Sequence, residues 1–216
     1  LVVCRTDTDP KAGAKAFSIL IVEDGMAGFE RGRNLEKMGM KAQDTSELFF
    51  NDVKVPKDNL LGEAGMGFIY LMRELPQERL SIAVSAVAAC EAVIQETVKY
   101  VKQRTAFGKT IADFQHTQFK LAELEAEVTV MRVFIDRCAE LLVKKELSTV
   151  EASKAKLLAT ELQGKVTDQC VQMHGGYGYM WEYPVARAYA DARVQRIYGG
   201  TSEVMKLIIG RDLLAD

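Results

Sequence analysis

The chain has 216 residues, a length that suits one large domain or two small ones, and 48% of them are hydrophobic, which is ample for a buried core. The net charge is -2 and basic residues are interleaved with acids, so the composition argues against nucleic acid as a partner. No run approaches the ~20 consecutive apolar residues of a membrane-spanning helix, and we expect no membrane span. Four cysteines lie far apart, without a C-x-x-C pair or histidines at ligand spacing, and predict buried thiols in a reducing compartment.

Residues 1–62 have the composition of strands and turns. Runs rich in β-branched and aromatic residues at 1–4, 16–23 and 48–55 predict strands, with Asp-Pro and Asp-Gly turn signals between them. A connecting loop is expected at 56–67. The chain opens on leucine inside the first run, without a signal or transit segment, so we expect a piece of a longer polypeptide.

The rest of the chain has helical spacing of apolar residues. The predicted helices are 68–102 with an interruption at Pro76, 115–144, 150–173, 185–194 and 201–214. A glycine- and tyrosine-rich turn at 175–179 and a Gly-Gly break at 199–200 separate the last of them. The expected fold is therefore mainly α, a bundle of long antiparallel helices (63–216) preceded by the end of a β domain (1–62).

The Gly-Gly break leads directly into the last helix. Gly199 and Gly200 let the backbone approach a ligand, while Thr201 or Ser202 can cap the helix and Glu203 follows in its first turn. Free N–H groups at a helix start form a natural phosphate site. An ordinary glycine turn with an N-cap explains the same residues and is the more common case.

The segment Q-M-H-G-G-Y-G-Y, residues 172–179, ends a helix with three glycines and two tyrosines. Glycine there can be a simple helix C-cap. In the functional interpretation, the backbone from Gln172 and Met173 through Gly175 and Gly176 lies against a flat cofactor. His174 lacks a nearby nucleophile pattern or a second ligand, so no catalytic role is expected for it.

The segment R-T-A-F-G-K, residues 104–109, is an aromatic-glycine turn between two helices. Arg104 can form bidentate hydrogen bonds to a pyrophosphate, with Phe107 and Gln115 close to it in sequence. A basic interhelical loop is the alternative explanation.

The segment E-L-P-Q-E-R-L, residues 74–80, places a proline within a helical pattern. Pro76 predicts a kink or a new helix start. In the first turn of such a helix, Glu78 would suit the helix dipole, and a surface ion pair with Arg79 is equally ordinary.

In combination these segments resemble the carboxy-terminal signatures of the acyl-CoA dehydrogenase family. The resemblance rests on R-T-A-F-G-K, on Q-M-H-G-G-Y-G-Y and on D-A-R-V-Q-R-I-Y-G-G-T-S-E at 191–203. The run K-M-G-M-K-A-Q-D-T-S-E-L-F-F-N-D-V-K-V-P at 37–56 resembles the end of the family's middle β domain. E-L-P-Q-E-R-L and G-Y-M-W-E-Y-P at 178–184 are most similar to the long-chain branch.

One departure from the family's pattern concerns the catalytic base. Most members carry a glutamate directly before the G-T of the last signature, but here that position is Gly199, which cannot act as a base. In the long-chain and isovaleryl branches the glutamate comes from the helix after the β domain. Glu78 matches that alternative position, so the resemblance implies Glu78 as the base.

The resemblance implies FAD-dependent α,β-dehydrogenation of fatty acyl-CoA thioesters in β-oxidation. Glu78 would take the α proton in a pocket without water, and Arg79, Gly199 and Gly200 would contact the substrate. The flavin contacts implied by the resemblance are divided among three groups of residues. They are Arg104, Phe107 and Gln115 for the flavin of a neighbouring subunit, Gln172, Met173, His174, Gly175 and Gly176 for the adenosine part, and Thr201, Ser202 and Glu203 for the pyrophosphate.

The implied partners are an electron-transfer flavoprotein as acceptor and further copies of the chain, in a homo-oligomer that is typically a tetramer in this family. The implied compartment is the bacterial cytoplasm or the mitochondrial matrix. A non-catalytic assembly or binding module of the same family, an acyl-CoA oxidase, and a preference for short acyl chains stay open as alternatives. We expect these 216 residues alone to be inactive and to bind FAD weakly or not at all, because the parts of the family's fold that cover the flavin are missing.

Overall fold

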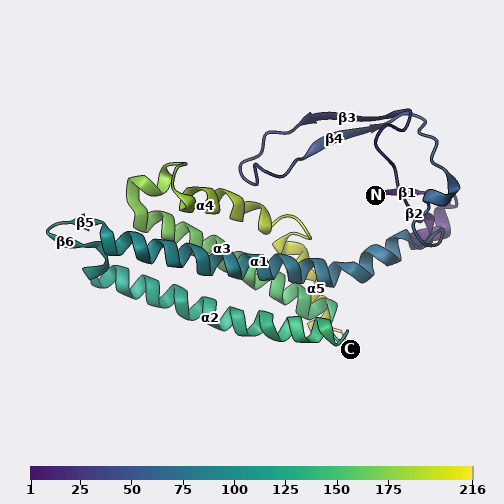
Figure 1. Ribbon diagram of the computed structural model, residues 1–216. Helices are drawn as coiled ribbons and strands as arrows, with labels where there is room; N and C mark the ends of the chain where they lie inside the picture. The colour runs from purple at the N-terminus through teal and green to yellow at the C-terminus, as the bar shows by residue number, and fades with distance from the viewer. Residues whose placement is uncertain (216) are drawn as a thin grey trace. The chain divides into compact units, whose positions relative to one another are not determined.

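The computed structural model describes residues 1–215 and divides the chain into two compact units (Figure 1). Unit 1 comprises Leu1–Lys37 and Lys41–Leu75, and unit 2 comprises Met38–Met40 together with the chain from Pro76 onward. The expected architecture, a long helical bundle with short strands before it in sequence, is confirmed.

Unit 1 contains two antiparallel strand pairs. Strand β1 (Val2–Arg5) pairs with β2 (Phe17–Leu20), and β3 (Phe29–Asn34) pairs with β4 (Ser46–Phe50). Short 3-10 helices, η1 (Pro10–Ala16) and η2 (Lys57–Asn59), lie in the connections.

The strand predictions for unit 1 were right in part. The predicted strands at 1–4 and 16–23 correspond to β1 and β2, but β2 ends at Leu20, and the strand predicted at 48–55 corresponds to β4, which ends at Phe50. Strand β3 was missed, because its sequence F-E-R-G-R-N is polar and contains glycine, which is unusual strand composition. Pairing with β4 holds it in place, including a stack of the Phe29 and Phe50 rings at 5.1 Å.

Helix α1 (Gly67–Gln103) continues through Pro76, so no new helix starts there. Proline removes one helical hydrogen bond and costs about 3 kcal/mol within a helix. Downstream of Pro76, the burial of Leu80, Ala83 and Val87 against the other helices stabilises the segment and offsets that cost.

A short β-hairpin and a 3-10 helix connect α1 to the next long helix. A hairpin of β5 (Thr105–Ala106) and β6 (Lys109–Thr110) follows α1, and its central Phe107 and Gly108 have φ of 54° and 80°, as a two-residue hairpin of the primed type requires. The 3-10 helix η3 (Ile111–Asp113) then leads into α2 (Gln115–Val143).

Local capping sets the ends of the remaining helices. Helix α3 (Thr149–His174) begins with a capping box between Ser148 and Glu151 and ends at Gly175, whose φ is 58°. The 3-10 helix η4 (Gly175–Tyr179), α4 (Pro184–Gln195) and α5 (Ser202–Leu213) complete the described chain.

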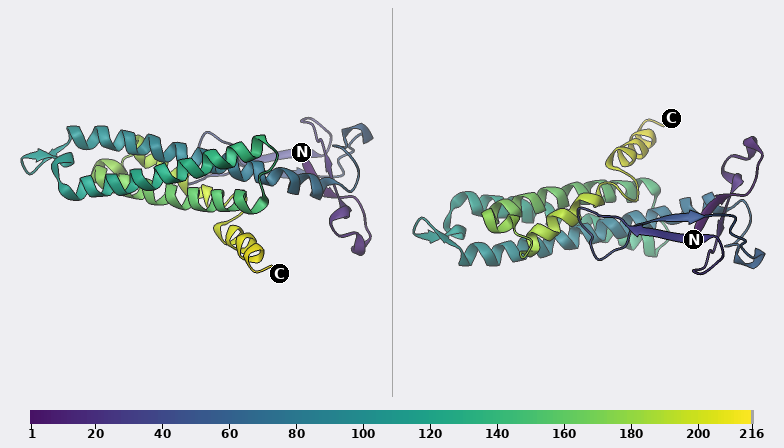
Figure 2. Two further views of the ribbon diagram at one scale, coloured as in Figure 1. Left: turned by 90° about the horizontal axis from the view of Figure 1, so that it is seen from below. Right: turned by 90° about the horizontal axis from the view of Figure 1, so that it is seen from above.

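Helices α1 to α4 form the bundle, and α5 projects from its side (Figure 2). Its core contains the buried thiols expected from the sequence, whereas Cys4 in unit 1 is only partly buried. Helix α1 is also long and apolar enough, by length and composition alone, to cross a membrane. Because its apolar residues from Leu80 to Ile94 pack into the bundle core, a core helix explains the same composition.

Candidate functional site

The Gly-Gly break lies against α1, where it contacts the residue that follows the predicted base Glu78. The Nε of Arg79 donates to the carbonyl of Gly199 at 3.3 Å. A Cβ at Gly199 would lie only 2.5 Å from Cδ1 of Ile82. Glu78 and Ile82 are four residues apart and therefore lie on the same face of α1. A side chain at position 199 would point at that face.

Glu78 itself is exposed, whereas its neighbour Arg79 is 5% exposed. The described chain alone therefore does not enclose the Glu78 carboxylate in the water-free pocket expected for it. Burial lowers the pKa of the Arg79 guanidinium, and the nearby charge of Glu78 opposes this effect. The Nη1 of Arg79 also donates to the hydroxyl of Ser153 on α3, at 3.4 Å.

A second buried cation reaches the same turn from α3. Lys156 is fully buried, and its ammonium donates to the carbonyl of Gly200 at 2.6 Å. Burial lowers the pKa of Lys156, the positive charge of Arg79 lowers it further, and the carboxylates of Glu161 and Glu203 oppose the shift.

The start of α5 is a capped helix N-terminus. The Thr201 hydroxyl accepts from the Val204 N–H at 3.3 Å, and Ser202 is buried and donates to the Glu161 carboxylate at 2.5 Å. Hydrogen bonds from its own backbone N–H and from the Thr201 hydroxyl lower the pKa of the exposed Glu203 carboxyl. An acid already compensates the helix dipole where the sequence predicted a pyrophosphate contact.

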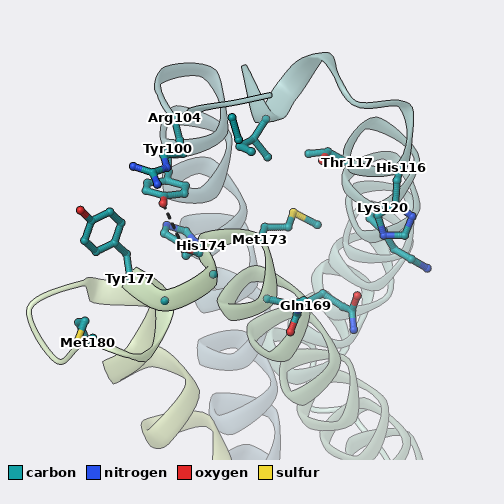
Figure 3. A pocket seen from close by; sticks show the side chains of 15 residues that line it. Tyr100, Arg104, His116, Thr117, Lys120, Gln169, Met173, His174, Tyr177 and Met180 are labelled. Atoms are coloured by element: carbon teal, nitrogen blue, oxygen red, sulfur yellow. Dashed lines mark hydrogen bonds between the residues drawn. The ribbon is translucent and has the colours of Figure 1, made fainter. Parts of the chain in front are cut away.

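Six of the other predicted cofactor residues line a cavity at the far end of the bundle (Figure 3). Its volume is about 660 Å³, within the usual range for cofactor sites. The walls include Arg104 and Lys120 and no carboxylate of the described chain. The lining residues predicted from the sequence are Arg104, Gln172, Met173, His174, Gly175 and Gly176.

Aromatic rings form one side of this cavity (Figure 3). The His174 ring stacks on Tyr100 with centroids 4.2 Å apart, and the Arg104 guanidinium lies 5.5 Å from the centre of the Tyr177 ring. His174 Nδ1 is 2.8 Å from the carbonyl of Cys170, which can only accept, so Nδ1 carries a proton. Burial lowers the pKa of His174 and keeps the ring neutral.

The structure does not bring all predicted cofactor residues together. Phe107 is 95% exposed at the hairpin tip, and Gln115 is exposed at the start of α2 outside the cavity lining. Arg79 and Gln103 are separated by about 36 Å along α1, at 1.5 Å per residue. The Gly199–Glu203 segment, which Arg79 contacts, is therefore far from the cavity beside Arg104.

Several residues of both regions were missed from the sequence. Lys156 and Ser153 lie on the buried face of α3 with Ala152 and Ala159. A lysine at a core-facing position of the helical repeat is the sequence feature that could have identified Lys156. Tyr177 also lines the cavity and lies within the segment 172–179 noted in the sequence, whereas no local pattern marks Tyr100, His116, Thr117 and Lys120 on α1 and α2.

The chain is similar to known proteins over its whole length. Residues 65–214 match the family model described as acyl-CoA dehydrogenase, C-terminal domain. The chain is 56% identical, over all of its 216 residues, to the mitochondrial long-chain specific acyl-CoA dehydrogenase of Mus musculus, of which it covers 50%.

Solved structures of acyl-CoA dehydrogenases also have a similar fold. The crystal structure of an acyl-CoA dehydrogenase from Geobacillus kaustophilus has a TM-score of 0.96 and 50% identity, with 99% of this chain and 56% of that one covered. An acyl-CoA dehydrogenase complexed with FAD from Bacillus anthracis has a TM-score of 0.86 and 33% identity, with 92% and 37% covered. The chain spans about half the length of the curated relatives it matches. It belongs to the acyl-CoA dehydrogenase family and carries that family's C-terminal domain.

Proposed function

We propose that the protein containing this chain dehydrogenates fatty acyl-CoA thioesters between their α and β carbons, with FAD as cofactor and Glu78 as base. The observation that carries the proposal is the contact of Gly199 with α1, through the Arg79 hydrogen bond and beside Ile82. A glycine occupies the family's usual base position, and the Glu78 carboxylate lies one helical turn from Ile82, the side chain that this glycine faces. The Glu78 carboxylate takes the α proton, and the hydride leaves the β carbon, so a double bond forms between the two carbons.

The surroundings of Glu78 support its role as a base. The buried guanidinium of Arg79 directly follows Glu78 in the chain, and the two opposite charges attract each other. We propose that polypeptide corresponding to the unmatched half of the relatives covers Glu78 and excludes water from it. Residues 1–62 would then be the end of a middle β domain, and residues 63–216 the C-terminal domain.

The residues present fit FAD in two separate places. The cavity beside Arg104 combines a cation, flat aromatic rings and the open backbone of Gly175 and Gly176, which suits an adenosine diphosphate group. The Thr201–Glu203 segment at the start of α5 would contact the cofactor from a different side. When bound, the flavin supplies the hydride acceptor, for which the chain has no group of its own.

The separation of these places supports sharing of the cofactor between copies of the chain. About 36 Å of helix α1 lies between them, too far for one chain to contact one extended dinucleotide with both. Helix α5 also exposes apolar side chains, with Val204 42%, Leu207 50% and Leu213 79% exposed. We therefore propose a homo-oligomer, and a tetramer by resemblance to the family.

The further partners and the compartment follow from the family. We propose fatty acyl-CoA as substrate, with a long acyl chain by similarity to the mouse relative, and an electron-transfer flavoprotein as electron acceptor. The named relatives include mitochondrial and bacterial proteins, so the mitochondrial matrix or the bacterial cytoplasm is the proposed compartment.

The test is Glu78→Gln in the full-length protein, with flavin bleaching by acyl-CoAs of graded length as the measurement. Loss of the base is expected to slow bleaching by about 10²–10⁴-fold while the flavin stays bound. Glu96→Gln is the matched control, because Glu96 is an exposed acid of the same helix whose one ion pair within residues 1–215 is with Lys99. Unchanged bleaching in the Glu78 variant would end the assignment of the base, and a full-length protein without flavin or bleaching would favour a non-catalytic module.

A further inference from the structure

Lys156 is a lysine in an environment that ordinarily excludes charge. It is 0% exposed on α3, among Ala152, Ala155 and Ala159. Removing an ammonium from water costs several kcal/mol unless hydrogen bonds and opposite charges compensate it. In residues 1–215 no carboxylate lies within ion-pair distance of Lys156, and its one hydrogen-bond acceptor is the Gly200 carbonyl.

Arg79 is a second buried cation of this kind, and it contacts the carbonyl of the residue before Gly200. It is also buried without an ion pair within the described chain, and it donates to the carbonyl of Gly199. Two cations, one from α1 and one from α3, thus hold two consecutive carbonyl groups. We call the three residues Gly199, Gly200 and Thr201 the glycine turn.

The direction of the carbonyl groups determines where the N–H groups of the glycine turn point. All peptide bonds of the described chain are trans, and in a planar trans peptide the N–H is opposite the C=O. With both carbonyls directed at cations of the bundle, the N–H groups of Gly200 and Thr201 are directed away from it. Neither N–H has a hydrogen-bond acceptor among the described residues.

We propose that Lys156 is a positioning residue of the glycine turn. By holding the Gly200 carbonyl, it keeps the N–H groups of Gly200 and Thr201 directed at an oxygen atom of the bound acyl-CoA or flavin. This inference rests on the function proposed above, in which the turn contacts substrate and cofactor. Lys156 does not touch the reacting atoms and acts through the backbone of the turn.

Stability and function are expected to respond differently to loss of the charge. Lys156→Met removes the desolvation cost of the ammonium but leaves the Gly200 carbonyl without its donor, so it should lower stability modestly without unfolding the bundle. The carbonyl would lose its charge-assisted partner, and the glycine turn would sample other peptide orientations. A purely structural lysine would instead reveal itself by lower stability with an unchanged turn.

The experiment uses the full-length holoenzyme, with Lys154→Met as the matched control on an exposed position of the same helix. Hydrogen exchange of the Ser202 and Met205 amides reports the turn, because these amides donate to the carbonyls of Arg196 and Thr201. Exchange should become at least about tenfold faster in Lys156→Met and stay unchanged in the control. Lys156→Gln serves as the second variant if Lys156→Met does not fold.

Two further measurements identify the oxygen that the turn contacts. Weaker flavin retention in Lys156→Met would place it on the flavin. A flavin reduction rate about tenfold lower at saturating acyl-CoA, with flavin fully retained, would place it on the substrate. Unchanged exchange of both amides, or unchanged retention and reduction rate, overturns the proposal. Because amide exchange needs no turnover, this result is independent of whether Glu78→Gln abolishes bleaching.

Discussion

Gly199 is the position where the structure makes the strongest quantitative prediction. Its φ is 64°, in the left-handed region, which costs a residue with a Cβ about 1–2 kcal/mol. A Cβ would also lie 2.5 Å from Cδ1 of Ile82, the flexible end of a half-buried side chain, and relief of that overlap should cost about 1 kcal/mol. Gly199→Ala is therefore expected to lower the free energy of unfolding by about 2–3 kcal/mol.

The two contributions can be separated with a double-mutant cycle. Ile82→Val removes the Cδ1 methyl and little else, at a cost of about 0.5–1 kcal/mol for a half-buried site. In that background Gly199→Ala should cost only the backbone part, about 1–2 kcal/mol, which gives a coupling energy of about 1 kcal/mol. Urea unfolding of the full-length protein, compared at unchanged slope, measures all four proteins.

Two outcomes would refute the reasoning. Equal costs of Gly199→Ala in both backgrounds would mean that position 199 does not face Ile82. It would then not face the side of α1 that carries Glu78. A cost near zero in both would contradict the left-handed backbone. If the cycle holds, a glutamate at 199 would be strained, which is a physical reason for the base to lie on α1.

Two predictions concern the far end of the bundle. Arg104→Gln should weaken FAD retention by about 10- to 100-fold, because a charged hydrogen-bond donor is lost. Lys102→Gln, at an exposed neighbouring position, should leave FAD retention unchanged. Flavin absorbance after dialysis measures retention, and equal effects of the two variants would exclude a specific role for Arg104. Because burial lowers the pKa of His174 below 6.5, the unfolded state binds a proton there before the folded state does, and the free energy of unfolding should fall as pH drops below about 6.5. His174→Gln should reduce that slope in urea titrations at several pH values.

The helices were predictable because their signals are local. Apolar residues three and four positions apart marked 115–144, and α2 spans Gln115–Val143. The capping residues Thr201 and Gly175 lie where the sequence predicted a cap and a C-cap. Each of these features depends on residues within about one helical turn, so the sequence contains the whole interaction.

Strand β3 and the continuation of α1 through Pro76 were not predictable in the same way. Strand β3 depends on β4, which follows it only after an intervening loop, and its own composition is polar. A proline within a helical pattern predicts a break or a kink. Helix α1 nevertheless continues through Pro76, because the residues after it are buried in the bundle.

The sequence alone determined the family resemblance, the order of the helices, the absence of a base at Gly199 and the presence of a carboxylate at Glu78. Tertiary structure decided that Arg79 and Lys156, which are 120 and 44 residues from the carbonyls they hold, meet at one turn. It also decided that the cavity beside Arg104 lies far from that turn, because a continuous helix advances 1.5 Å per residue. Hydrogen bonds between distant residues depend on how helices pack, and spacing along the chain does not encode that packing.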